Sequence, residues 1–140
     1  MKNTDFNQFE KTLHETLYLS GHIQFGQQII IAVSGGKDSM TLLYSMRRIA
    51  DRLNVKIKAV HLNHHLRGNS NNDQNLVDKF CKQLKIDLTV DHLDPDTKGR
   101  GESPEAWARD HRYASLERIR KETGADWIFT AHHGLSLIHI

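Results

Sequence analysis

The sequence has 140 residues, enough for one domain around a single core and too few for a second full domain. Its 38% hydrophobic and 26% charged residues are typical of a soluble globular protein and exclude a disordered chain. A net charge of +2 is too small to indicate a nucleic-acid partner by itself. With no apolar stretch near the ~20 residues that span a bilayer and no signal-peptide region, we expect a cytoplasmic protein without a membrane partner.

The first predicted element is an amphipathic helix over residues 4–20, in which apolar residues recur at steps of three and four. A continuous apolar run at 29–33 then predicts a strand over 28–33 that is covered on both faces. A glycine turn follows, and the helical period of the apolar residues between 42 and 53 predicts the next helix. This order of strand, turn and helix is half of a βαβ unit.

The alternation continues to the end of the chain, with predicted strands at 57–62, 86–90 and 127–131 and predicted helices at 72–84 and 104–123. Ser103 is the expected cap of the last helix, and Gly124 is expected to end it. The pattern predicts an α/β fold: a doubly wound parallel sheet with helices on both faces. The single cysteine, Cys81, excludes an internal disulfide and a thiolate zinc cage, and we expect it to be a buried apolar side chain.

The turn after the first strand reads Ser34-Gly35-Gly36-Lys37-Asp38-Ser39. Ligands of doubly wound sheets bind where strands end, so this turn is the first place to look for a site. Two glycines allow a phosphate to approach the backbone, the following helix offers free N–H groups, and the serine hydroxyls add donors. The patterns G-x-x-x-x-G-K-[ST] and G-x-G-x-x-G do not fit, but the turn still predicts an anion site.

These six residues resemble the loop S-G-G-x-D-S of the N-type ATP pyrophosphatases, which cleave ATP between the α- and β-phosphates. An acid in a phosphate-binding loop requires a nearby cation, so we expect Asp38 to be a Mg²⁺ ligand or to lie near one. Lys37 either helps to neutralise the released pyrophosphate or is a solvated surface charge.

Three further segments narrow the resemblance: residues 61–68 read HLNHHLRG, residues 108–113 read ARDHRY, and residues 130–133 read TAHH. Together with the loop they resemble the tRNA(Ile)-lysidine synthetases, whose members carry H-x-N-H-x-L-R-G, A-R-x-x-R-Y and T-A-H-H in this order. The resemblance covers about residues 28–133. It implies a Rossmann-like fold of the adenine nucleotide alpha hydrolase type.

The resemblance also implies a reaction. ATP adenylates the C2 carbonyl oxygen of the wobble cytidine in tRNA(Ile) with a CAU anticodon, pyrophosphate leaves, and free L-lysine displaces AMP to give lysidine. ATP and Mg²⁺ are then expected at the loop residues, with His61 and Asn63 on the adjoining rim. The sequence does not decide between a monomer and a homodimer.

The candidate catalytic residues besides Asp38 are two arginines and two histidines. Arg109 and Arg112 share a helix face and are expected to stabilise the charge that develops on the phosphates, unless they belong to a surface of ion pairs. His132 and His133 are predicted to contact lysine or the reaction centre. A zinc site at the strand-end histidines is not expected, because no thiolate or acid–histidine helix motif accompanies them.

The resemblance breaks after residue 133. The family continues with acidic residues and Q-A-E-T, whereas residues 134–140 read GLSLIHI. We therefore expect residues 1–133 to be the ATP-binding domain, residues 134–140 to be an aberrant tail, and the C-terminal tRNA-binding domains to be absent, with little or no complete turnover. The alternative is a short protein whose last residues form a strand.

Two other functions stay open. A tRNA thiolase can share the loop S-G-G-K-D-S but usually needs paired cysteines. A non-catalytic module could bind an adenine nucleotide without cleaving it. GMP and NAD synthetases share the loop but lack the other segments.

Overall fold

The computed structural model describes residues 8, 10, 11, 23, 24, 26–65, 70–94, 96, 98–131 and 135–139. The elements in chain order are β1 (Gln28–Ala32), α2 (Lys37–Leu53), β2 (Lys56–Asn63), α3 (Ser70–Leu84), β3 (Asp87–His92), α4 (Pro104–Thr123), β4 (Trp127–Ala131) and β5 (Leu135–His139). Of the helix predicted over 4–20, residues 8, 10 and 11 are helical, and the rest lies outside the described residues.

The strands form one sheet in the order β3-β2-β1-β4-β5, and β1 to β4 pair in parallel. Because β1 lies between β2 and β4, the chain leaves β1 toward one edge and returns to its other side, which is the topology of a doubly wound sheet. The predicted fold class is therefore confirmed. Residues 135–139, expected as a tail, add a fifth strand that pairs antiparallel with β4.

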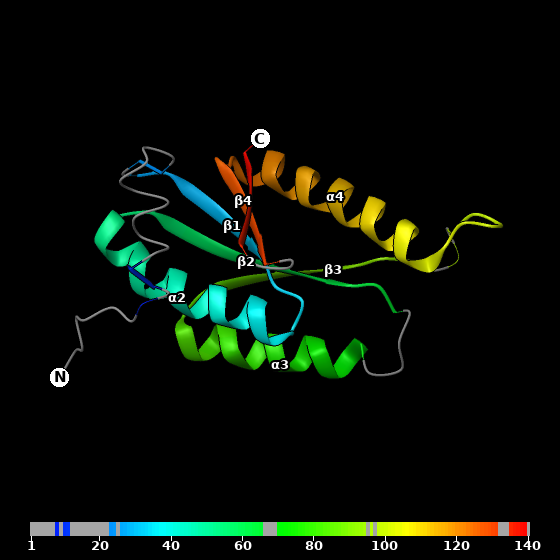
Figure 1. Ribbon diagram of the computed structural model, residues 1–140, viewed down its shortest axis with the longest axis horizontal. Coiled ribbons are helices and arrows are strands. Elements are labelled where there is room, and N and C mark those ends of the chain that lie inside the picture. Colours follow the sequence, from blue (N-terminus) through cyan, green and yellow to red (C-terminus); the bar gives the residue numbers. More distant parts are fainter. Residues whose placement is uncertain are drawn as a thin grey trace.

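Two layers of helices cover the sheet, with α2 and α3 on one face and α4 on the other (Figure 1). Successive side chains of a strand point to opposite faces, so Ile29 and Ile31 pack in the cluster formed with α2 and α3, whereas Ile30 packs in the cluster formed with α4. All three are fully buried. This two-sided burial explains the uninterrupted apolar run of β1.

Helix α4 begins and ends as predicted. The side chain of Ser103 accepts a hydrogen bond from the Ala106 N–H at 3.1 Å, and Gly124 ends the helix with a left-handed φ of +75°. One side of the helix is buried, and it carries Trp107, Leu116 and Ile119. Leu116 and Ile119 pack with Ile30 and Ile128 of the sheet, and this contact fixes α4 on that face.

Cys81 is buried in the larger cluster, as predicted. Burial, and then the neighbouring Asp78 carboxylate, raise the pKa of its thiol to about 11. The protonated thiol is therefore an apolar component of the core at neutral pH.

No helix in the described part of the chain combines the length and the apolar composition that a bilayer-spanning segment needs.

Candidate functional site

A pocket of about 440 Å³ opens at the carboxyl ends of β1, β2 and β4. Its lining in the described residues is formed by Ala32, Val33, Ser34, Gly35, Gly36, Ser39, Val60, His61, Leu62, Asn63, His64, Asp73, Leu93, Ala108, Arg112 and Thr130. The pocket lies where the sheet topology reverses, so the predicted strand-end site and the observed cavity coincide.

The glycine loop is held by its two serines. Ser39 Oγ donates to the Gly36 carbonyl at 3.0 Å and accepts from the Ser34 N–H at 3.1 Å. Since that donation uses the only hydroxyl proton of Ser39, the Ser34 hydroxyl donates the 3.1 Å bond between the two oxygens. Ser34 Oγ also accepts from the Gly36 N–H at 3.2 Å. The serines therefore shape the loop by internal hydrogen bonds.

The backbone of the loop packs closely against α3 at Gly35 and leads into the first turn of α2 at Gly36. Gly35 has a φ of +91°, and a Cβ at this residue would lie 3.2 Å from Cβ of Asp73, so both the conformation and the space favour glycine. Gly36 caps α2 without a side-chain hydrogen bond. The first N–H groups of the helix have no intrahelical acceptor and carry the positive end of its dipole, which suits an anion.

His61 supports the loop from the neighbouring strand. It is 3% exposed, and its Nδ1 lies 2.6 Å from the carbonyl oxygen of Val33, immediately before the loop. A carbonyl can only accept, so Nδ1 carries the proton of this hydrogen bond. His61 therefore fixes the end of β1 and lines the pocket.

Asn63 is buried and lines the same pocket, but its amide is engaged by the protein. Nδ2 donates to Oδ1 of Asn71 at 3.0 Å and to Oε1 of Gln74 at 2.9 Å, while Oδ1 accepts from the His65 N–H at 3.0 Å. Both amide protons are used in this way. The geometry favours a role for Asn63 in fastening the start of α3 to the end of β2.

The two candidate arginines differ in position. Arg112 is half-buried and lines the pocket, and no acid in the described part of the chain pairs with it. Its guanidinium carbon lies 5.7 Å from the centroid of the Tyr113 ring. Arg109 is 62% exposed, lies 3.7 Å from Asp110 and does not line the pocket. The structure places Arg112 in the lining of the pocket and leaves Arg109 on the outside of α4.

Lys37 and Asp38 are exposed on the first turn of α2, next to the pocket lining but not part of it. His132 and His133 lie outside the described residues. Within those residues, no group of three or more His, Cys, Asp or Glu side chains is placed to hold a metal ion.

Several lining residues were not among the candidates. Ala108 lies one helical turn before Arg112, so the helical period could have identified it. Leu93 is brought in by pairing, because its N–H donates to the Asn63 carbonyl at 2.9 Å. Nothing in the sequence pattern indicates that Asp73 lines the pocket, because an acid in the first turn of a helix is ordinarily explained by the helix dipole.

Comparison with known proteins identifies the family of the chain. A family described as the PP-loop domain matches residues 2–136, so the chain belongs to the PP-loop domain family. The chain is 39% identical over 118 residues to the tRNA(Ile)-lysidine synthase of Thermotoga maritima, which covers 83% of this chain and 28% of that protein. It is 35% identical over 129 residues to the tRNA(Ile)-lysidine synthase of Pseudothermotoga lettingae, with 91% and 29% covered. The resemblance drawn from the four motifs is confirmed.

The chain spans less than a third of the length of these curated relatives. Among solved structures, it superposes on a U34-tRNA thiolase from Methanococcus maripaludis with its [4Fe-4S] cluster, with a TM-score of 0.75 over 86% of this chain and 43% of that chain. The two are 19% identical in sequence, so this likeness shows the shared fold.

Proposed function

We propose that the chain binds Mg·ATP and serves as the adenylating part of a tRNA(Ile)-lysidine synthase. In this reaction the O2 oxygen of the wobble cytidine attacks the α-phosphorus of ATP, the bond to the β-phosphate breaks, and pyrophosphate leaves. The amine of free L-lysine then attacks C2, and AMP departs. The family match and the lysidine synthase relatives support this proposal.

The observation that carries the proposal is the meeting of the glycine loop and Arg112 in one pocket. The loop offers backbone N–H groups and a helix dipole to the phosphates that leave. The guanidinium of Arg112 has no acidic partner in the described part of the chain, so its charge is available to the phosphate on which negative charge develops. His61 keeps the loop in place behind these groups.

Magnesium fits the chemistry of the donors beside the loop. It prefers oxygen ligands and is usually held by one or two carboxylates together with the phosphates of the nucleotide. Asp38 supplies a carboxylate at the start of α2, next to the loop. The ion would screen the triphosphate charge, while the residues of this chain bind and orient the nucleotide.

Several finer assignments belong to the same proposal: Lys37 beside the pyrophosphate, His132 and His133 at the reaction centre, and tRNA(Ile), L-lysine and a second copy as partners. We also propose that these 140 residues alone give little or no complete turnover. Lysidine formation by the isolated chain would contradict that part of the proposal and leave ATP binding intact.

Calorimetry with Mg·ATP tests the central claim. Arg112→Ala should weaken ATP binding about tenfold to a hundredfold, because a hydrogen bond to a charged group contributes about 1.5–3 kcal/mol. Arg109→Ala is the matched control, since it removes the same charge from the outside of the same helix, and it should change the affinity less than threefold by surface screening. Equal effects of the two variants would refute the assignment of Arg112.

Pyrophosphate release separates the remaining alternatives. A non-catalytic nucleotide-binding module releases none, either with or without tRNA and lysine. A thiolase is disfavoured because the single cysteine of the chain is buried and its thiol has a raised pKa.

A further inference from the structure

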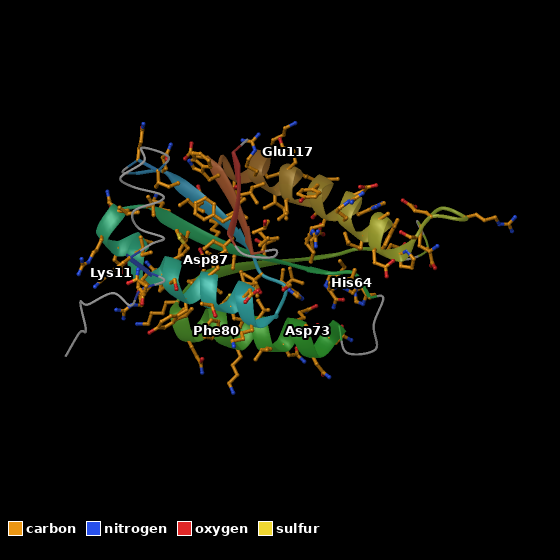
Figure 2. The ribbon with its side chains drawn as sticks, in the orientation of Figure 1. Lys11, His64, Asp73, Phe80, Asp87 and Glu117 are labelled. Atoms are coloured by element: carbon orange, nitrogen blue, oxygen red, sulfur yellow. The ribbon has the colours of Figure 1, made fainter. Side chains whose placement is uncertain are left out.

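Asp73 is the one carboxylate that lines the pocket in the described part of the chain, and neither the motifs nor the proposed reaction gives it a role. It lies in the first turn of α3 and is half-buried. No hydrogen bond or ion pair to another described residue engages its carboxylate. Figure 2 shows Asp73 on the stretch of α3 that lies beneath the loop, with His64 at the end of β2.

The position of Asp73 is fixed against the phosphate-binding backbone. Its Cβ would lie 3.2 Å from a Cβ at Gly35, and its carbonyl oxygen 3.5 Å. The Asn63 amide holds this turn of α3 by donating to Asn71 and Gln74, on either side of Asp73 in the sequence. The carboxylate therefore stays within one side-chain length of the loop.

A carboxylate in this place repels the triphosphate. Two like charges a few ångströms apart in a partly desolvated pocket disfavour each other strongly, and Arg112 is the one fixed cation among the described lining residues. A bound cation between the carboxylate and the phosphates reverses the sign of this interaction. The oxygen atoms of the carboxylate and of the phosphates are the ligands that Mg²⁺ prefers.

Building on the proposed function, we infer that Asp73 holds the magnesium ion that accompanies ATP at the loop. Asp38 is exposed at the start of α2 and does not line the pocket, whereas Asp73 lines it from α3, so Asp73 adds a second carboxylate to the one that Asp38 supplies beside the loop. Asp73 then makes ATP affinity depend on magnesium in two ways. It strengthens the binding of Mg·ATP and weakens the binding of ATP without the metal.

The test measures the affinity of the full chain for ATP by calorimetry, with Mg²⁺ and with EDTA, for the parent chain, Asp73→Asn and Asp78→Asn. Asp78 lies on the same helix outside the pocket and pairs with Lys82 at 2.9 Å, so it is a matched control. Asp73→Asn should weaken Mg·ATP binding about tenfold and strengthen metal-free ATP binding about threefold. Asp78→Asn should change neither affinity.

These opposite signs separate a cation-binding role from a structural one. A variant that loses affinity equally with and without Mg²⁺ has a disturbed loop, and that result overturns the inference, as does an unchanged affinity in both conditions. If Asp73→Asn is poorly folded by circular dichroism, Asp73→Glu replaces it and should retain the magnesium dependence. Mn²⁺ provides a second readout, because its electron paramagnetic resonance signal with ATP should change in Asp73→Asn.

Two further outcomes are distinguishable. If the magnesium dependence is unchanged in Asp73→Asn but binding of free L-lysine is lost, the cation at Asp73 is an ammonium group and the inference is wrong. If the parent chain binds no ATP in either condition, the proposed function itself fails.

Discussion

Substitution of Gly35 with alanine perturbs the loop at a position where both the backbone conformation and the space for a side chain are restricted. The residue has a φ of +91°, a region that side chains other than glycine rarely adopt, and the strain is of order 1–3 kcal/mol. The new Cβ also meets Cβ of Asp73 at 3.2 Å, and such overpacking costs about 1–3 kcal/mol more. The expected loss of unfolding free energy is therefore roughly 2–6 kcal/mol.

Gly124→Ala is the matched control, because Gly124 also has a positive φ of +75° but no atom within 4 Å of its would-be Cβ. It should lose about 1–2 kcal/mol from the backbone alone. Urea unfolding measures both losses, and calorimetry measures Mg·ATP binding, which should weaken at least about tenfold in Gly35→Ala and stay unchanged in Gly124→Ala. Equal destabilisation of the two variants, or unchanged ATP affinity in Gly35→Ala, would refute the argument that Asp73 limits the space at the loop.

Three other predictions concern the support of the site. Ser103→Ala should lower the unfolding free energy by about 1 kcal/mol, because the Ala106 N–H loses its acceptor, and urea unfolding would show no change if the cap were irrelevant. His61→Leu should lose about 1–3 kcal/mol by leaving the Val33 carbonyl without its donor, whereas His61→Asn keeps a donor near Nδ1 and should lose less; the reverse order would contradict the assigned tautomer. The Cys81 thiol has its pKa raised to about 11 from 9.0, so its contribution to stability is complete below pH 9 and is lost as the pH rises toward 11. Chemical unfolding of the parent chain and Cys81→Ala across this range should show the parent losing more stability, and native thiol labelling at pH 8 should be slow.

The sequence predicts the strands, helices and turns of the molecule well, because the residues that indicate each of them are close together in the chain. The β-branched run before Val33, the cap at Ser103 and the terminator at Gly124 each depend on neighbours in the chain, and the structure contains each as expected. The glycine loop is equally local. Its position at the reversal of the sheet follows from the alternation of strands and helices.

The sequence is less informative where side chains from distant elements meet. Spacing places Arg109 and Arg112 on one helix face, but only the packing of α4 shows that Arg112 reaches the pocket. Asp73 enters through the contact of α3 with Gly35, which no periodicity encodes. Residues 135–139 join the sheet through antiparallel pairing with β4, a contact that short apolar segments do not specify. The roles of His132 and His133 stay predictions.

The Asn63 amide makes this pocket chemically vulnerable. Its nitrogen faces two amide oxygens, from Asn71 and Gln74, so the arrangement depends on hydrogen atoms that an acid oxygen does not carry. Deamidation of Asn63 replaces this nitrogen with a carboxylate oxygen, so the amides of Asn71 and Gln74 would have to turn and donate through their own nitrogens. The change would also place a new negative charge in the lining of the pocket, and an ageing sample would be expected to lose nucleotide affinity before it lost its fold.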